Sequence, residues 1–177
     1  MDRPLDTLIT LLLEDADPGL AEAHWELYPE RVPERIPLSL TLLYPWIRAE
    51  EVTQADLDRL RFCFGARPQL EFDLVRLAEF PGVVVYAVPE PDEELRATMR
   101  ALWALYPEYP PYGHVGYEPA PHATLGRLDG PDAITLAGAE KRVGGLLPVH
   151  CRVLEATLME EDEPDRWRVC KSFPFGR

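Results

Sequence analysis

Two short segments of the sequence carry polar side chains in the same arrangement. SLTL at residues 39–42 contains Ser39 and Thr41, and HATL at residues 122–125 contains His122 and Thr124. Side chains two residues apart lie on the same face of a β-strand, so each segment would present its polar pair together. An imidazole can transfer protons near neutral pH, and hydroxyl groups can hydrogen-bond to developing negative charge. The spacing therefore predicts two chemically related strand faces.

The elements that must position these faces alternate between strands and helices. Residues 6–14 are almost wholly apolar and predict a central strand. Asp17-Pro18 predicts a helix start and Thr53 another, with Gly65 as a helix end. The pattern then predicts a β-hairpin over 69–88, a helix from Asp92, a Pro- and Tyr-rich loop over 106–121, and a helix over 131–146. Residues 149–160 and 166–173 predict a final hairpin.

This order predicts an α+β protein with several antiparallel strand pairs. The chain has 177 residues, which is enough for one domain with a sizeable core, so we expect a single domain over 1–177. Each of the two polar strands is followed by a helix and then by a hairpin. An internal duplication that forms two similar lobes would explain this order.

Charge and composition exclude several classes of function. The formal net charge is −13, which argues against a protein that follows long nucleic acid, because phosphate contacts are made by Lys and Arg clusters. The absence of a long apolar run and of a signal peptide argues against a membrane protein and for a cytoplasmic one. The three cysteines lack metal-ligand spacing, and we expect reduced thiols and no metal site.

The segments SLTLLYPW at 39–46 and PHATLGRL at 121–128, the apolar first strand and the PPYG loop together identify a family. The chain resembles the two-histidine (2H) phosphoesterases, which include bacterial 2′-5′ RNA ligase-like proteins and RNA cyclic phosphodiesterases. The resemblance implies two pseudo-symmetric lobes of antiparallel sheet with flanking helices around a central cleft. It also implies no cofactor and no metal.

The resemblance assigns roles to residues of both segments. His122 and Thr124 would be catalytic, and Ser39, Thr41, Tyr44 and Arg127 would bind the substrate. In such enzymes one imidazole removes a proton from the attacking group while the other protonates the leaving oxygen. The implied ligand is a small phosphoester, such as a 2′,3′-cyclic or 2′,5′-linked nucleotide, or an RNA end.

The sequence departs from the family pattern at Ser39, which stands where the first motif should begin with His. A serine hydroxyl can bind a phosphate oxygen but cannot exchange protons at pH 7, so the loss should cost about 10²–10⁴ in rate. Ser39 could act as a nucleophile only beside a base, and the neighbouring sequence contains none. The chain could therefore be a weakened cyclic nucleotide phosphodiesterase, a catalytically silent nucleotide- or phosphometabolite-binding module, or a scaffold that kept the fold.

Each candidate also has a purely structural interpretation. His122 could be an ordinary half-buried histidine, and the threonines could simply favour strands. Strand alternation places Arg127 on the face opposite His122 unless the chain bends at Gly126. Tyrosines near both motifs could stack a nucleobase or only pack.

The remaining histidines have weaker signals. His114 could reach the cleft as a substitute acid or base, or could be exposed in its loop. His24 lies on the apolar face of its helix and is expected to be structural, and His150 has no nameable partner. The acidic segment 159–165 is expected to be a hairpin tip.

Overall fold

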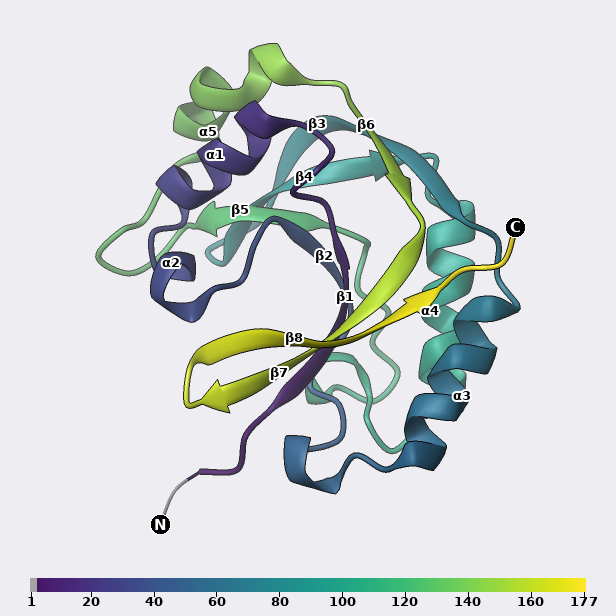
Figure 1. Ribbon diagram of the computed structural model, residues 1–177. Helices are drawn as coiled ribbons and strands as arrows, with labels where there is room; N and C mark the ends of the chain where they lie inside the picture. The colour runs from purple at the N-terminus through teal and green to yellow at the C-terminus, as the bar shows by residue number, and fades with distance from the viewer. Residues whose placement is uncertain (1–2) are drawn as a thin grey trace.

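The computed structural model describes residues 3–177 and shows an α+β fold in which helices pack on a curled, antiparallel eight-stranded sheet (Figure 1). The strand order is β6-β3-β4-β5-β2-β1-β7-β8. The strands are β1 (Thr7–Leu12), β2 (Ser39–Leu43), β3 (Leu70–Phe80), β4 (Val84–Glu90), β5 (Ala123–Arg127), β6 (Val149–Val153), β7 (Glu155–Glu163) and β8 (Arg166–Pro174).

The helices are α1 (Pro18–Leu27), α2 (Arg31–Glu34), α3 (Gln54–Gly65), α4 (Glu93–Leu105) and α5 (Leu136–Val143), with 3₁₀ turns at Ala49–Glu51, Pro111–Gly113 and Gly144–Leu146. Two predicted helix starts are confirmed. The Asp17 carboxylate accepts a hydrogen bond from the amide of Leu20, and Thr53 forms a capping box with Asp56. The one-turn helix α2 was not predicted.

The predicted C-terminal hairpin is only partly correct. The strand is interrupted at Leu154, so residues 149–160 form parts of two strands, β6 and β7, rather than one. Strand β6 pairs with β3 at one edge of the sheet, whereas β7 crosses to pair with β1 and β8 at the other (Figure 1). The segment therefore connects the two halves of the sheet.

The two halves, β6-β3-β4-β5 and β2-β1-β7-β8, meet where β5 pairs with β2. Within residues 3–177 this seam is in register at one position only, Leu40 opposite Ala123, while every other neighbouring pair matches at four or more positions. Both seam residues are fully buried. The two motif strands are thus direct neighbours at the centre of the sheet.

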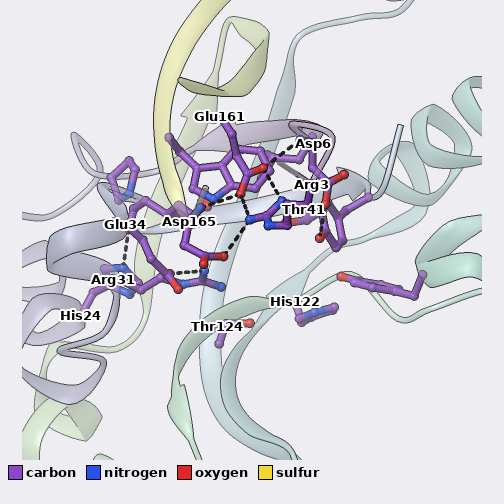
Figure 2. A pocket seen from close by; sticks show the side chains of 17 residues that line it. Arg3, Asp6, His24, Arg31, Glu34, Thr41, His122, Thr124, Glu161 and Asp165 are labelled. Carbon is purple, nitrogen blue, oxygen red and sulfur yellow. Dashed lines mark hydrogen bonds and ion pairs between the residues drawn. The ribbon is translucent and has the colours of Figure 1, made fainter. Parts of the chain in front are cut away.

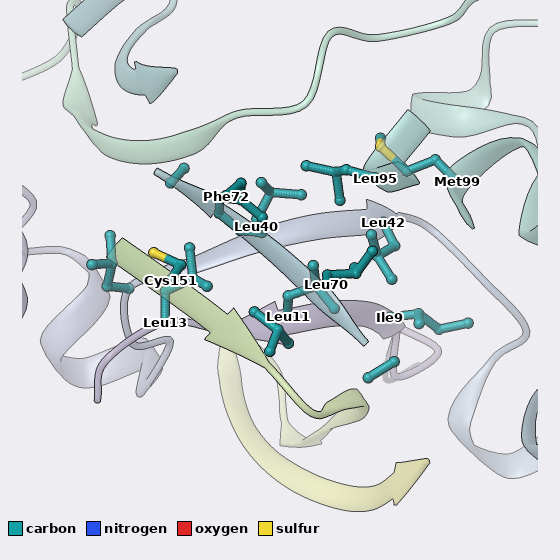
Figure 3. Close-up of a cluster of buried hydrophobic side chains, with 14 of the residues drawn as sticks. Ile9, Leu11, Leu13, Leu40, Leu42, Leu70, Phe72, Leu95, Met99 and Cys151 are labelled. Carbon is teal, nitrogen blue, oxygen red and sulfur yellow. The ribbon is translucent and has the colours of Figure 1, made fainter. Parts of the chain in front are cut away.

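One hydrophobic core joins all the long helices to the sheet. It contains alternate residues of the motif strands, Leu40 and Leu42 on β2 and Ala123 and Leu125 on β5, so their partners at 39, 41, 122 and 124 face the other side. Figure 3 shows part of this core, where Leu95 and Met99 of α4 approach the strands. The opposite side of β2 and β5 is left for a site.

No helix in residues 3–177 is long and apolar enough to span a bilayer. All three cysteines are free thiols, with Cys151 in the core.

Candidate functional site

A cavity of about 540 Å³ lies on the side of β2 and β5 that faces away from the helical core (Figure 2). Five of the six predicted site residues line it: Ser39, Thr41, Tyr44, His122 and Thr124. The two polar strand faces are thus brought together in one hollow. The sixth predicted residue, Arg127, is not part of the lining.

A β-bulge in β2 explains how Tyr44 reaches the cavity. Thr41 is opposite Thr10 of β1, but Leu43 is opposite Ile9, so Leu42 is an extra residue. Simple alternation would place Tyr44 on the other face of the strand from Thr41. Because the bulge reverses the alternation, Leu43 is buried in the core and Tyr44 faces the cavity.

Strand β5 has a matching bulge after its own threonine. Thr124 is opposite Tyr86 of β4 and Gly126 is opposite Val85, so Leu125 is the extra residue. Gly126 packs so closely under α1 that a Cβ atom there would lie 2.7 Å from the carbonyl oxygen of Leu27. The backbone therefore requires glycine at this bend.

The bend at Gly126 was the condition under which Arg127 could have joined the site, but the side chain takes another course. Its guanidinium lies on the exposed end of β5 and binds both carboxylate oxygens of Asp129 at 2.9 Å. The geometry does not bring Arg127 to the cavity.

The imidazole of His122 is oriented by its own backbone. Its Nδ1–H donates to the carbonyl oxygen of Ala120 at 2.7 Å, because a carbonyl can only accept, and this leaves the lone pair of the neutral ring on Nε2. The rings of Phe80 and Tyr86 meet it edge-on, with centroids at 5.0 and 5.5 Å. Burial among them lowers the pKa of His122, and the Ala120 carbonyl only partly offsets this. The ring is thus a neutral base at pH 7.

The hydroxyl groups of Ser39, Thr41 and Thr124 line the cavity and are half-buried. None of the three is hydrogen-bonded to a partner within residues 3–177, whereas the nearby hydroxyl of Thr10 donates to the carbonyl of Leu40 at 3.0 Å. Half-buried hydroxyls without a protein partner are free to donate to a ligand.

Aromatic rings form one wall of the cavity. Tyr112 lies beside both His122 and Tyr44, with centroids at 6.5 and 6.4 Å, and Tyr44 in turn meets Trp167 at 6.2 Å. The amide of Tyr112 donates to the carbonyl of Tyr44 at 2.7 Å, which ties the loop before β5 to the turn after β2. Tyr112 has φ 53° and ψ 25°, a left-handed conformation that a tyrosine rarely adopts.

Another part of the cavity lining contains Glu161, which is 3% exposed and forms an ion pair (Figure 2). Arg3 binds both of its carboxylate oxygens at 2.6 and 2.8 Å and also reaches Asp165 at 2.9 Å. The amides of Asp6 and Asp165 donate to it as well. Burial raises the pKa of Glu161, but these donors outweigh it, and the pKa lies below its ordinary value. The sequence predicted a hairpin tip for the segment that contains this acid, whereas Glu161 lies within β7.

Two more acidic groups line the cavity. Glu34 pairs with Arg31 at 2.7 Å on the one-turn helix α2, and the Arg31 guanidinium lies over the ring of Tyr28. The carboxylate of Asp6 accepts a hydrogen bond from the hydroxyl of Tyr44 at 3.1 Å. Burial and this neighbour raise the pKa of Tyr44 to about 12. Asp6 and Glu34 both lie outside the two motif segments 39–46 and 121–128.

A second imidazole also lines the cavity. His24 of α1 is 2% exposed, its Nε2 donates to the carbonyl of Ile36 at 3.1 Å, and its buried Nδ1 has no partner within residues 3–177. Burial is the largest influence on the pKa of His24 and lowers it, although the backbone of Thr124 acts to raise it. His24 thus packs between the segment that leads into β2 and strand β5 and also lines the cavity, so its structural role stays a prediction.

The two remaining histidines lie elsewhere. His114 is exposed in its loop against the edge of Tyr117 and does not line the cavity. His150 has a partner that the sequence did not reveal: strand register places it opposite Asp73, and its Nδ1 lies 2.8 Å from that carboxylate. Within residues 3–177 no cluster of His, Cys, Asp and Glu has the arrangement of a metal site.

Comparisons with known proteins place this geometry in context. The family model of the 2′-5′ RNA ligase superfamily matches residues 14–165. The fold is similar to that of E. coli LigT complexed with 3′-AMP, with a TM-score of 0.63 and 17% identity over 99% of this chain and 100% of that one. It is also similar to TT0787 of Thermus thermophilus, with a TM-score of 0.65 and 20% identity over 97% and 99%. No curated protein matches the chain.

Proposed function

We propose, from the premise that this chain belongs to the 2′-5′ RNA ligase superfamily, that it binds a small phosphoester such as a 2′,3′-cyclic or 2′,5′-linked nucleotide and acts on it slowly through His122. The observation that carries the proposal is the meeting of three unpartnered hydroxyls and one oriented imidazole in a single cavity. Structures of E. coli LigT with 3′-AMP, ATP, NADP⁺ and phosphate support a phosphate-bearing ligand.

In this proposal the hydroxyls of Ser39, Thr41 and Thr124 donate to the phosphate oxygens and stabilise the charge that develops on them. Nε2 of His122 accepts the proton of an attacking water, a task that suits a neutral ring with a lowered pKa. The leaving oxygen takes its proton from solvent water rather than from a positioned acid, because Ser39 stands where the second imidazole would be. Turnover should therefore be about 10²–10⁴ below that of a two-histidine site.

Ser39 also favours a second candidate, a binding module without catalysis. In that case the hydroxyls and the aromatic wall of Tyr44, Tyr112 and Trp167 would hold a nucleotide or a phosphorylated metabolite. The two candidates share one cavity and differ only in whether His122 transfers a proton.

The test measures binding and hydrolysis of a 2′,3′-cyclic nucleotide by calorimetry and by chromatography of the products. The proposal expects binding and slow turnover that is lost in His122→Ala, while His114→Ala, a change of an exposed histidine outside the cavity, leaves turnover unchanged. Binding without turnover would establish the module instead. If the protein shows neither binding nor turnover, both candidates are overturned.

A further inference from the structure

Negative side chains outnumber positive ones around the cavity. Its lining includes four carboxylates, from Asp6, Glu34, Glu161 and Asp165, against two guanidinium groups within residues 3–177, those of Arg3 and Arg31. The whole chain has the same bias, with 31 acidic and 18 basic residues. A field of this sign opposes the entry of anions, and it does so more strongly for each added negative charge.

Both guanidinium groups are already engaged. Arg3 binds Glu161 and Asp165, and Arg31 binds Glu34. The fourth carboxylate, Asp6, has the Tyr44 hydroxyl as its partner and no cation within 4 Å among residues 3–177. Each guanidinium group in the lining is therefore already paired with a carboxylate, and one negative charge has no cationic partner.

The donors that remain are neutral. They include the hydroxyls of Ser39, Thr41 and Thr124, whereas the neutral ring of His122, whose Nδ1–H is already bound to Ala120, offers only the lone pair of Nε2. Neutral hydroxyls can satisfy the two oxygens that share the single charge of a phosphodiester. A phosphomonoester carries about −1.5 to −2 charges at pH 7, and its desolvation favours cationic partners that are not already neutralised by carboxylates, as Arg3 and Arg31 are here.

We infer, on the basis of the proposed function, that this cavity selects phosphodiesters with one negative charge and rejects phosphomonoester dianions. Two features determine this specificity: the carboxylate of Asp6, which has no cationic partner, and the ion pair in which Glu34 neutralises Arg31. A further consequence is that a hydrolysis product, which gains the second charge, is expelled rather than retained.

The experiment compares three adenosine ligands by calorimetry at pH 7.5: the 2′,3′-cyclic phosphate, the 3′-methylphosphate and the 3′-phosphate. The first two carry one charge and differ in shape, whereas the third carries two. We expect the first two to bind similarly and the third to bind roughly tenfold more weakly or worse. Asp6→Asn and Glu34→Gln should each narrow this difference several-fold, and Asp132→Asn, a change of an exposed acid outside the cavity, should leave it unchanged.

Equal or tighter binding of the 3′-phosphate would overturn the charge selection while leaving the proposed function intact. The same holds if the open methyl diester binds as weakly as the 3′-phosphate, because shape rather than charge would then decide. Binding of none of the three would overturn both proposals. Binding of the cyclic ester by each variant shows that its cavity is intact, and the wild-type comparison decides the matter where a variant does not fold.

Discussion

Strands β2 and β5 are close structural counterparts with different chemistry. Each carries a hydroxyl or imidazole two residues before a threonine, each has a bulge just after that threonine, and both line the same cavity. The first position is the imidazole of His122, with a fixed tautomer, just before β5, and it is Ser39 at the start of β2. The two strands thus share their backbone geometry, while only the β5 side presents an imidazole at this position. In the proposed function, binding depends on the feature that the strands share, and catalysis on the feature in which they differ.

The largest change should come from restoring the missing group. We expect Ser39→His to raise turnover of a 2′,3′-cyclic nucleotide by about 10²–10⁴, because the new imidazole can protonate the leaving oxygen. Steady-state rates measured by product chromatography test this. Ser172→His, a half-buried strand serine on β8 outside the cavity, is the matched control. An unchanged rate in Ser39→His would mean that the two strands are not catalytic counterparts.

The pH dependence of the rate should distinguish one working imidazole from two. The pKa of His122 lies below 6.5, and the neutral base accumulates as the pH rises through this lowered pKa. The wild-type rate should therefore climb below pH 6.5 and then level off. Ser39→His should add a descending limb at higher pH, where the new acid loses its proton. Rate profiles over about pH 5 to 9 would show both shapes. A bell-shaped wild-type profile would show that another residue supplies the general acid that Ser39 cannot.

The threonines should contribute equally if both strands hold the phosphate. Thr41→Val and Thr124→Val each remove one neutral hydrogen bond, and each should weaken ligand binding by about 0.5–1.5 kcal/mol. Calorimetry with the cyclic ester measures both losses, and Thr41→Ser and Thr124→Ser, which keep the hydroxyl, should restore most of the affinity. A loss confined to Thr124→Val would show that β2 no longer participates in binding.

The smallest effect concerns His24, which packs between the segment before β2 and strand β5. Its folded-state pKa lies below the ordinary 6.5, so the unfolded chain binds the proton first and the free energy of unfolding should fall as pH drops below 6.5. One histidine accounts for at most about 1.4 kcal/mol per pH unit. Denaturant titrations between about pH 7 and 5 should show a shallower slope in His24→Gln. An identical slope would assign the pH dependence to other groups.

Local pattern was enough to predict much of the fold. Alternation around Ser39 and His122, and caps at Asp17 and Thr53, depend on neighbours within a few residues, and the structure confirms them. The final hairpin was predicted less well, because nothing local indicates that β6 and β7 belong to opposite halves of the sheet. The internal duplication stays a prediction, although matched bulges are a detail that it would explain.

The candidate site was predictable only where the motifs lie. Tyr44 faces the cavity because of a bulge that alternation cannot reveal, and Arg127 was expected beside the phosphate but binds Asp129 two residues later. Glu161 and Arg3 come from opposite ends of the chain. Their pairing depends on strand register between β1 and β7, so a sequence pattern that spans a few residues does not contain it.

The seam between β5 and β2 has a mechanical consequence. At this seam strands β5 and β2 are matched at a single pair, Leu40 and Ala123. The seam itself therefore contributes little to the spacing between β5 and β2, which depends on the core packed beneath it and on the hydrogen bonds that join the halves elsewhere. Replacing Leu40 by a larger or a smaller apolar residue should therefore widen or narrow the cavity, without changing any side chain that lines it.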